Sequence, residues 1–111
     1  MTMCIHKIIP QGHISGIIIG RVAYIQSLYI DNTYRNRNFG TMLLHWFLNK
    51  SFHENAIHVE LDDCSSNYRK SNNIYIKNGF YYANNEHKMM ANIRQAIKKM
   101  NTVNSFLHIR S

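Results

Sequence analysis

A short polar segment between two apolar stretches carries the residue types that bind an anion. Arg35-Asn36-Arg37-Asn38-Phe39-Gly40-Thr41 follows a β-branched run that ends at Ile30 and precedes an amphipathic stretch over 40–50. The backbone N–H groups of the first helical turn have no intrahelical partners. Together with the helix dipole they favour a phosphate or pyrophosphate. The sequence therefore predicts an anion site over residues 35–41, where two arginines add positive charge.

This loop and a second segment resemble two motifs of the GCN5-related N-acetyltransferase (GNAT) superfamily. The family's acetyl-CoA loop has the pattern Gln/Arg-x-x-Gly-x-Gly/Ala, and Arg35, Asn38 and Gly40 stand at its three marked places. Asn38 replaces the first glycine, and Asn is the residue other than Gly that best tolerates a positive φ. Ile74-Tyr75-Ile76-Lys77-Asn78-Gly79-Phe80 is similar to the family's later Leu-Tyr-x-x-x-Gly-Phe segment. The resemblance covers roughly 22–82, just over half of the chain.

The resemblance implies that acetyl-CoA is a co-substrate whose acetyl group passes directly to an amine, with no metal and no covalent enzyme intermediate. In the family, backbone N–H groups near a strand bulge stabilise the oxyanion, the loop holds the pyrophosphate, and asparagines contact the pantetheine arm. The corresponding residues here are Leu28, Tyr29 and Ile30 for the oxyanion, Arg35, Asn36, Arg37, Asn38, Phe39, Gly40 and Thr41 for the pyrophosphate, and Asn67 and Asn73 for the pantetheine arm.

Three further residues are candidates for the proton transfers that this reaction needs. Tyr75 matches the family tyrosine that often protonates the departing thiolate, although a tyrosine at this place can also simply pack. Some relatives carry a glutamate as general base on the strand before the loop, where this chain has Tyr24. Because 22–30 contains no acid, the base would be water, Tyr24, or Glu60 on the next predicted strand.

Other chemistries find little support in the sequence. His53 and His58 miss the HExxH zinc spacing by one residue, so they do not share a helical face. Cys4 and Cys64 have neither CxxC nor framework spacing, which fits free thiols in a reducing compartment. Cys64 follows a predicted strand near the presumed cleft and is either a reactive thiol or an inert packing residue. Without an evident signal peptide or membrane span, the sequence predicts a cytoplasmic protein.

The elements that must position these residues follow from the hydrophobic pattern. Three antiparallel strands over 3–9, 13–19 and 22–30 are predicted, then a helix over 40–50 and a strand over 56–61 that lies parallel to 22–30. A helix over 67–78, capped by Ser65 or Ser66, and a strand over 80–83 follow, with a turn at 84–86. Residues 87–100 fit one helix by spacing, but the family favours a strand over 87–91 and a helix over 92–101, with a tail over 102–111.

The predicted fold class is α/β (α+β). It has a GNAT-like mixed central sheet, an antiparallel meander followed by a βαβ unit with splayed strands, and helices on both faces. Residues 1–111 are predicted to form a single domain that lacks the family's usual first strand and first two helices. The function that this implies is acetyl-CoA-dependent N-acetylation of an amine. The alternative is a non-catalytic GNAT-like module that acts through a protein or nucleic-acid partner.

The charge of the chain bears on its partners. A formal net charge of +7 favours an anionic ligand such as acetyl-CoA, but the basic residues are scattered, so nucleic-acid binding is the weaker interpretation. An uncovered strand edge predicts pairing of two copies into a homodimer. The acceptor amine stays open among protein N-termini, lysines, polyamines and small antibiotic-like amines. Heavy use of Ile, Asn, Lys and Tyr is typical of an AT-rich genome, such as that of a large DNA virus or a parasite.

Overall fold

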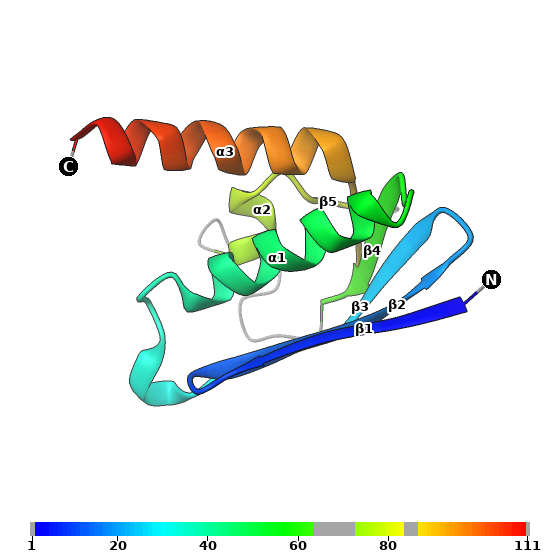
Figure 1. The fold of residues 1–111 in the computed structure, drawn as a ribbon, viewed down its shortest axis with the longest axis horizontal. Coiled ribbons are helices and arrows are strands. Elements are labelled where there is room, and N and C mark those ends of the chain that lie inside the picture. Colours follow the sequence, from blue (N-terminus) through cyan, green and yellow to red (C-terminus); the bar gives the residue numbers. More distant parts are fainter. Residues whose placement is uncertain (1, 64–72, 84–86, 111) are drawn as a thin grey trace.

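The chain folds into one six-stranded mixed sheet with helices packed against it (Figure 1). The computed structural model describes residues 2–63, 73–83 and 87–110. The strands lie in the order β1-β2-β3-β4-β6-β5, and the predicted fold class is confirmed. The elements are β1 (Thr2–Ile9), β2 (Gly12–Ile19), β3 (Val22–Ile30), the short 3-10 turn η1 (Asn32–Tyr34), α1 (Phe39–His53), β4 (His58–Asp62), α2 (Ile74–Lys77), β5 (Tyr81–Tyr82), β6 (Lys88–Asn92) and α3 (Ile93–Arg110).

The first three strands form the predicted antiparallel meander, with one irregularity. Ser15 pairs with Ser27 while its neighbour Gly16 pairs with Ile25, so Gln26 is an extra residue in β3. The bulge therefore lies at Gln26, and its expected place near Leu28 to Ile30 was wrong. Gly16 permits the bulge because the backbones approach closely: a Cβ there would lie 2.1 Å from the carbonyl oxygen of Tyr24.

The predicted parallel crossover is also present. β3 and β4 are parallel neighbours on either side of α1 in the sequence, and Val22 to Ile25 pair with His58 to Leu61. The pairing ends there, although β3 continues to Ile30. The two strands therefore part at their carboxyl ends, and the resulting gap is the place for a ligand in a sheet of this kind.

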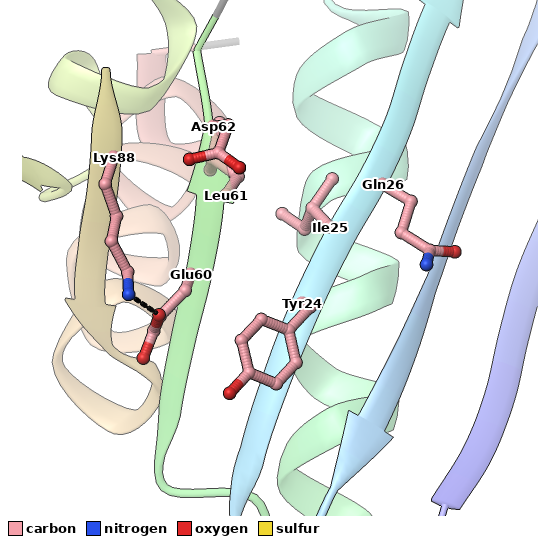
Figure 2. Close-up of a pocket in the computed structure, with 7 residues that line it drawn as sticks. All are labelled: Tyr24, Ile25, Gln26, Glu60, Leu61, Asp62 and Lys88. Atoms are coloured by element: carbon pink, nitrogen blue, oxygen red, sulfur yellow. Dashed lines mark ion pairs between the residues drawn. The ribbon is translucent and has the colours of Figure 1, made fainter. Parts of the chain in front are cut away.

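The sheet buries one face. Paired residues of neighbouring strands share a face, and the buried set runs across the sheet through Ile18, Ala23, Val59 and Ala91 beneath α1 and α3. The opposite face carries Tyr24, Glu60 and Lys88, whose side chains point away from both helices (Figure 2). Helices were expected on both faces, but within the part of the chain that the structure describes, α1 and α3 share one face and leave the other uncovered.

The local predictions for the second half of the chain have different outcomes. A continuous helix over 67–78 is wrong, because Asn73 has an extended backbone with ψ of 128° and α2 starts after it. The predicted caps Ser65 and Ser66 and the turn at 84–86 lie outside the described residues. A strand and then a helix do occupy 88–110, but the predicted tail is wrong, because α3 continues to Arg110 with no Gly or Pro to stop it.

No helix in the described ranges is long and apolar enough to cross a membrane.

Candidate active site

The predicted anion loop ends in an open helix start. Asn36 and Asn38 have positive φ angles of 64° and 68°, and α1 begins immediately afterwards at Phe39. Asparagine thus does hold the left-handed conformation that the family loop gives to glycine. The Asn38 side chain makes no capping hydrogen bond. Its side chain therefore leaves the N–H groups in the first turn of α1 open. A helix start without a side-chain cap leaves its N–H groups available to an anion.

The two loop arginines have different surroundings. The Arg35 Nε donates a hydrogen bond of 3.0 Å to the carbonyl oxygen of Ile30, and its guanidinium lies 6.0 Å from the centre of the Tyr29 ring. Arg35 therefore ties the loop back to the end of β3. Arg37 is exposed and lies two residues before the start of α1. The Arg37 side chain can therefore turn toward a bound anion while Arg35 keeps its hydrogen bond to Ile30.

Gly40 lets three elements meet beside the loop. A Cβ at this position would lie 3.1 Å from Ile74 Cδ1 and 3.7 Å from Ile30 Cγ1. The start of α1 therefore sits directly against the end of β3 and the first residue of α2. The anion loop and the Tyr75 segment, which the sequence paired only by resemblance, are neighbours in space.

A pocket of about 390 Å³ opens where β3 and β4 part (Figure 2). It is lined from three strands, by Tyr24, Ile25, Gln26, Glu60, Leu61, Asp62 and Lys88. Two of the predicted proton-transfer candidates, Tyr24 and Glu60, thus share one pocket. Figure 2 shows the Tyr24 hydroxyl and the Glu60 carboxylate on the same side of the sheet. The bulged residue Gln26 also lines this pocket, so the irregularity of β3 lies at the pocket itself.

Glu60 is held in an ion pair that the sequence did not indicate. Lys88 Nζ lies 2.7 Å from Glu60 Oε1, with 46% of the lysine side chain and 13% of the glutamate side chain exposed. The hydrogen bond and the negative charge of Glu60 raise the pKa of Lys88, with smaller contributions from Tyr24 and Asp62. Lys88 is a functional candidate that sequence reasoning missed. Side chains alternate between the two faces along the predicted strand 87–91. This alternation could have indicated that Lys88 lies on the same face of the sheet as Glu60.

Tyr75 lies apart from this pocket. Its ring packs against Phe80 at 5.4 Å between centroids, and it is not among the residues that line the pocket. Burial, and secondly the negative charge of Asp63, raise the pKa of Tyr75 far above the usual value of about 10. Its phenol is therefore protonated at neutral pH. Because its pKa exceeds that of a thiol, Tyr75 is suited to donating a hydrogen bond to a thiolate rather than giving up its proton.

A buried carboxylate connects Tyr75 to the end of β4. Asp63 is 3% exposed and accepts hydrogen bonds of 2.7 Å from Asn73 Nδ2 and of 2.7 Å from the Tyr82 hydroxyl. Asn73 Oδ1 in turn accepts from the backbone N–H groups of Tyr75 and Ile76 and so caps α2. In the sequence, Asp63 lies just after the predicted strand over 56–61. Its environment could not be predicted, because Asn73 and Tyr82 reach it through the tertiary fold.

The remaining predicted site residues have different positions in the structure. Asn73 was predicted to contact pantetheine, and in the structure its 2% exposed side chain holds α2 in place. Asn67 and the reactive-thiol candidate Cys64 lie outside the described residues. Leu28, Tyr29 and Ile30 are the last three residues of β3. Within the described ranges, no group of three His, Cys, Asp or Glu side chains is arranged to hold a metal ion.

Comparison with known proteins agrees with this geometry. The family model described as the acetyltransferase (GNAT) family matches residues 6–80. No curated protein matches the sequence. Among solved structures, an acetyltransferase from Bacillus cereus is similar, with 16% identity and a TM-score of 0.66 over 80% of this chain and 69% of that one.

Two further structures carry the same fold. The PaiA N-acetyltransferase from Thermoplasma acidophilum, in complex with coenzyme A, has 22% identity and a TM-score of 0.61 over 73% of this chain and 52% of its own. Tetrahymena GCN5 has 15% identity and a TM-score of 0.63 over 83% of this chain and 68% of its own. At such identities these likenesses establish the fold, whereas the family match covers most of the chain by sequence. The chain belongs to the GNAT acetyltransferase family.

Proposed function

We propose that the protein transfers an acetyl group from acetyl-CoA directly to an amine acceptor. One observation carries the proposal. The end of β3 lies beside the uncapped start of α1, and the pocket between β3 and β4 lies further back along the same strand β3. Ile30 is four residues beyond the bulged Gln26, which corresponds to about 13 Å of extended chain. This arrangement suits a substrate that has phosphates at one end and a thioester at the other.

The residues of the pocket suit the chemistry of this transfer. The amine nitrogen attacks the thioester carbon, the new C–N bond forms, and the C–S bond breaks with its electron pair on sulfur. We assign the amine proton to Glu60, directly or through water, because it is the largely buried carboxylate of the pocket. Backbone N–H groups of β3 from the bulge to Ile30 are proposed to stabilise the oxyanion, and Tyr75 is proposed to donate a hydrogen bond to the thiolate.

The first test targets the anion loop. Thr41 is the third residue of α1, and a glutamate at this position reaches back to the helix start, as in a capping box. Thr41→Glu therefore places a carboxylate of the protein where a phosphate would bind. Isothermal titration with acetyl-CoA is expected to show binding by the natural protein and a loss of affinity of about 100-fold or more in the variant.

Met42→Glu is the matched control, because Met42 is the next residue of the same helix and is 49% exposed. It adds the same charge without reaching the helix start, so binding should fall only slightly. Equal losses in both variants would contradict the assignment of the loop. Release of CoA thiol with a panel of amines then tests the transfer itself. No binding by the natural protein would contradict the proposed activity.

A non-catalytic GNAT-like module is the second candidate, and two observations favour it. Glu60 is already paired with Lys88, and Tyr75 does not line the pocket. A protein of this kind would bind acetyl-CoA, or no small molecule, and act through a partner. The amine panel separates the two candidates, because acetyl-CoA binding without thiol release for any amine favours the module.

A further inference from the structure

The Lys88 side chain occupies the position that an acceptor amine needs. It starts on β6 and runs beside β4, where its Nζ lies 2.7 Å from Glu60 Oε1 (Figure 2). Glu60 is the carboxylate to which the proposed mechanism assigns the amine proton. Lys88 also lines the pocket that opens at the parting of β3 and β4. A primary amine, a candidate base and the proposed place of the thioester are therefore already assembled within one chain.

We propose that Lys88 is a self-acetylation site, at which the protein transfers the acetyl group of acetyl-CoA to its own side chain. This inference rests on the proposed function. The Nζ lone pair attacks the thioester carbon, the N–C bond forms, and the C–S bond breaks with its electron pair on sulfur. The Nζ proton passes to Glu60 and then to solvent, and the CoA thiolate takes up a proton. The product is a neutral acetamide that no longer forms an ion pair with Glu60.

The surroundings of Lys88 predict how this reaction responds to pH. Glu60 and Asp62 on β4 and Tyr24 on β3 all act on its ammonium group and favour the charged form, while partial desolvation opposes them. The pKa of Lys88 is raised as a result, so little of the amine is neutral near pH 7. Because only the neutral amine attacks, the rate should rise about tenfold per pH unit between pH 7 and 9.

The chain supplies a matched internal comparison. Lys50 also pairs with a glutamate, at 3.3 Å from Glu54, and 44% of its side chain is exposed, against 46% for Lys88. The two lysines thus have similar exposure and similar partners, but Lys50 lies on α1 and does not line the pocket. Because the neighbours of Lys88 favour its charged form, acetylation by acetyl-CoA in solution should modify Lys88 no faster than Lys50. Transfer within the site should instead select Lys88.

The experiment is peptide mass spectrometry of the full chain, sampled over time with acetyl-CoA at pH 8. We expect Lys88 to be acetylated at least about tenfold faster than Lys50, since proximity favours the lysine in the site. Glu60→Gln removes the proposed base but also the charge that favours the ammonium form of Lys88, so at pH 8 it should slow the Lys88 reaction by about tenfold or more. Unchanged or faster labelling of Lys88 in this variant would overturn the role of Glu60. Glu54→Gln, the matched change at Lys50, should leave Lys88 acetylation as it is. Circular dichroism of both variants verifies that they are folded.

The outcomes separate this inference from the proposed function. Acetyl-CoA binding that is lost in Thr41→Glu, together with equal labelling of Lys88 and Lys50, overturns self-acetylation and leaves the proposed function intact. Labelling of Lys88 that persists in Thr41→Glu also overturns it, because the acetyl group then arrives from solution. If the natural protein does not bind acetyl-CoA, both proposals fall.

Discussion

At the scale of single residues, Tyr75 shows how burial sets the chemistry of a side chain. Its ring packs on Phe80, and both its burial and the charge of Asp63 disfavour the phenolate. A tyrosine in such a place keeps its proton at every pH at which an acetyl transfer would run. The pH dependence of transfer between pH 6 and 9 should therefore come from the acceptor amine and from Glu60, and not from Tyr75.

The same shift predicts a change in alkaline stability. The pKa of Tyr75 is raised in the folded protein above the value of about 10 in the unfolded chain. The stabilisation is therefore fully present below about pH 10 and is lost as the pH rises toward the folded pKa. Tyr75→Phe should lose less stability than the natural protein between pH 10 and 12, as measured by urea unfolding at each pH.

Tyr81→Phe is the control for that experiment, because Tyr81 is 57% exposed. It should follow the natural protein over the same pH range. If Tyr75→Phe loses stability with the same slope as Tyr81→Phe, the buried phenol is not the cause.

Asp63 should matter more for stability than its single carboxylate suggests. Asp63→Ala removes the acceptor of two hydrogen bonds and leaves the Asn73 amide and the Tyr82 hydroxyl without this partner. The free energy of unfolding should fall by about 3 kcal/mol, measured by urea denaturation. Tyr82→Phe removes only one of the two bonds and should cost about 1 kcal/mol. Equal effects would show that the Asp63–Asn73 contact contributes little.

At the scale of elements, the start of α1 depends on the backbone of Asn38. Its φ of 68° is accessible to Asn and Gly but is strained for a β-branched residue. Asn38→Gly should keep both folding and acetyl-CoA binding. Asn38→Val should lower the free energy of unfolding by about 1–2 kcal/mol and weaken binding as the helix start shifts. Urea unfolding and isothermal titration measure the two effects, and normal binding by the valine variant would contradict this role of the loop.

At the scale of the whole molecule, the net charge of +7 should assist binding of an anionic substrate without creating a nucleic-acid site. Salt screens such long-range attraction, with a Debye length of about 10 Å at 0.1 M. Raising NaCl from about 50 to about 300 mM should weaken acetyl-CoA binding by less than about tenfold. Duplex DNA should show no binding at about 150 mM salt, in contrast to the steep salt dependence of a true DNA-binding protein. Tight, salt-sensitive DNA binding in a mobility-shift assay would contradict this prediction.

The uncovered face and the edge of the sheet bear on assembly. β1 forms one edge, and Ile8, Ile19 and Tyr81 are exposed large apolar side chains on the face opposite α1 and α3. Pairing of two copies through β1 stays a prediction of the sequence. Sedimentation velocity over a range of concentrations would test it.

The order of the elements and the conformation of the loop over residues 35–41 can be predicted from the amino-acid sequence. Alternating apolar residues set the strands, and Asn38 and Gly40 set the loop, because these are local properties of a few adjacent residues. The parallel pairing of β3 and β4 followed from the connecting helix. The two family motifs led to the family itself, which the match over residues 6–80 confirms.

Which side chains share the site depends on the tertiary fold. The Lys88–Glu60 pair joins residues 28 positions apart, and it depends on the register between β4 and β6. The Asp63, Asn73 and Tyr82 contacts likewise depend on where three separate segments end. Sequence spacing fixes neither register nor burial, so it predicted a pantetheine contact for Asn73 and left Tyr75 as either a proton donor or a packing residue. Packing made Asn73 the cap of α2 and raised the pKa of Tyr75.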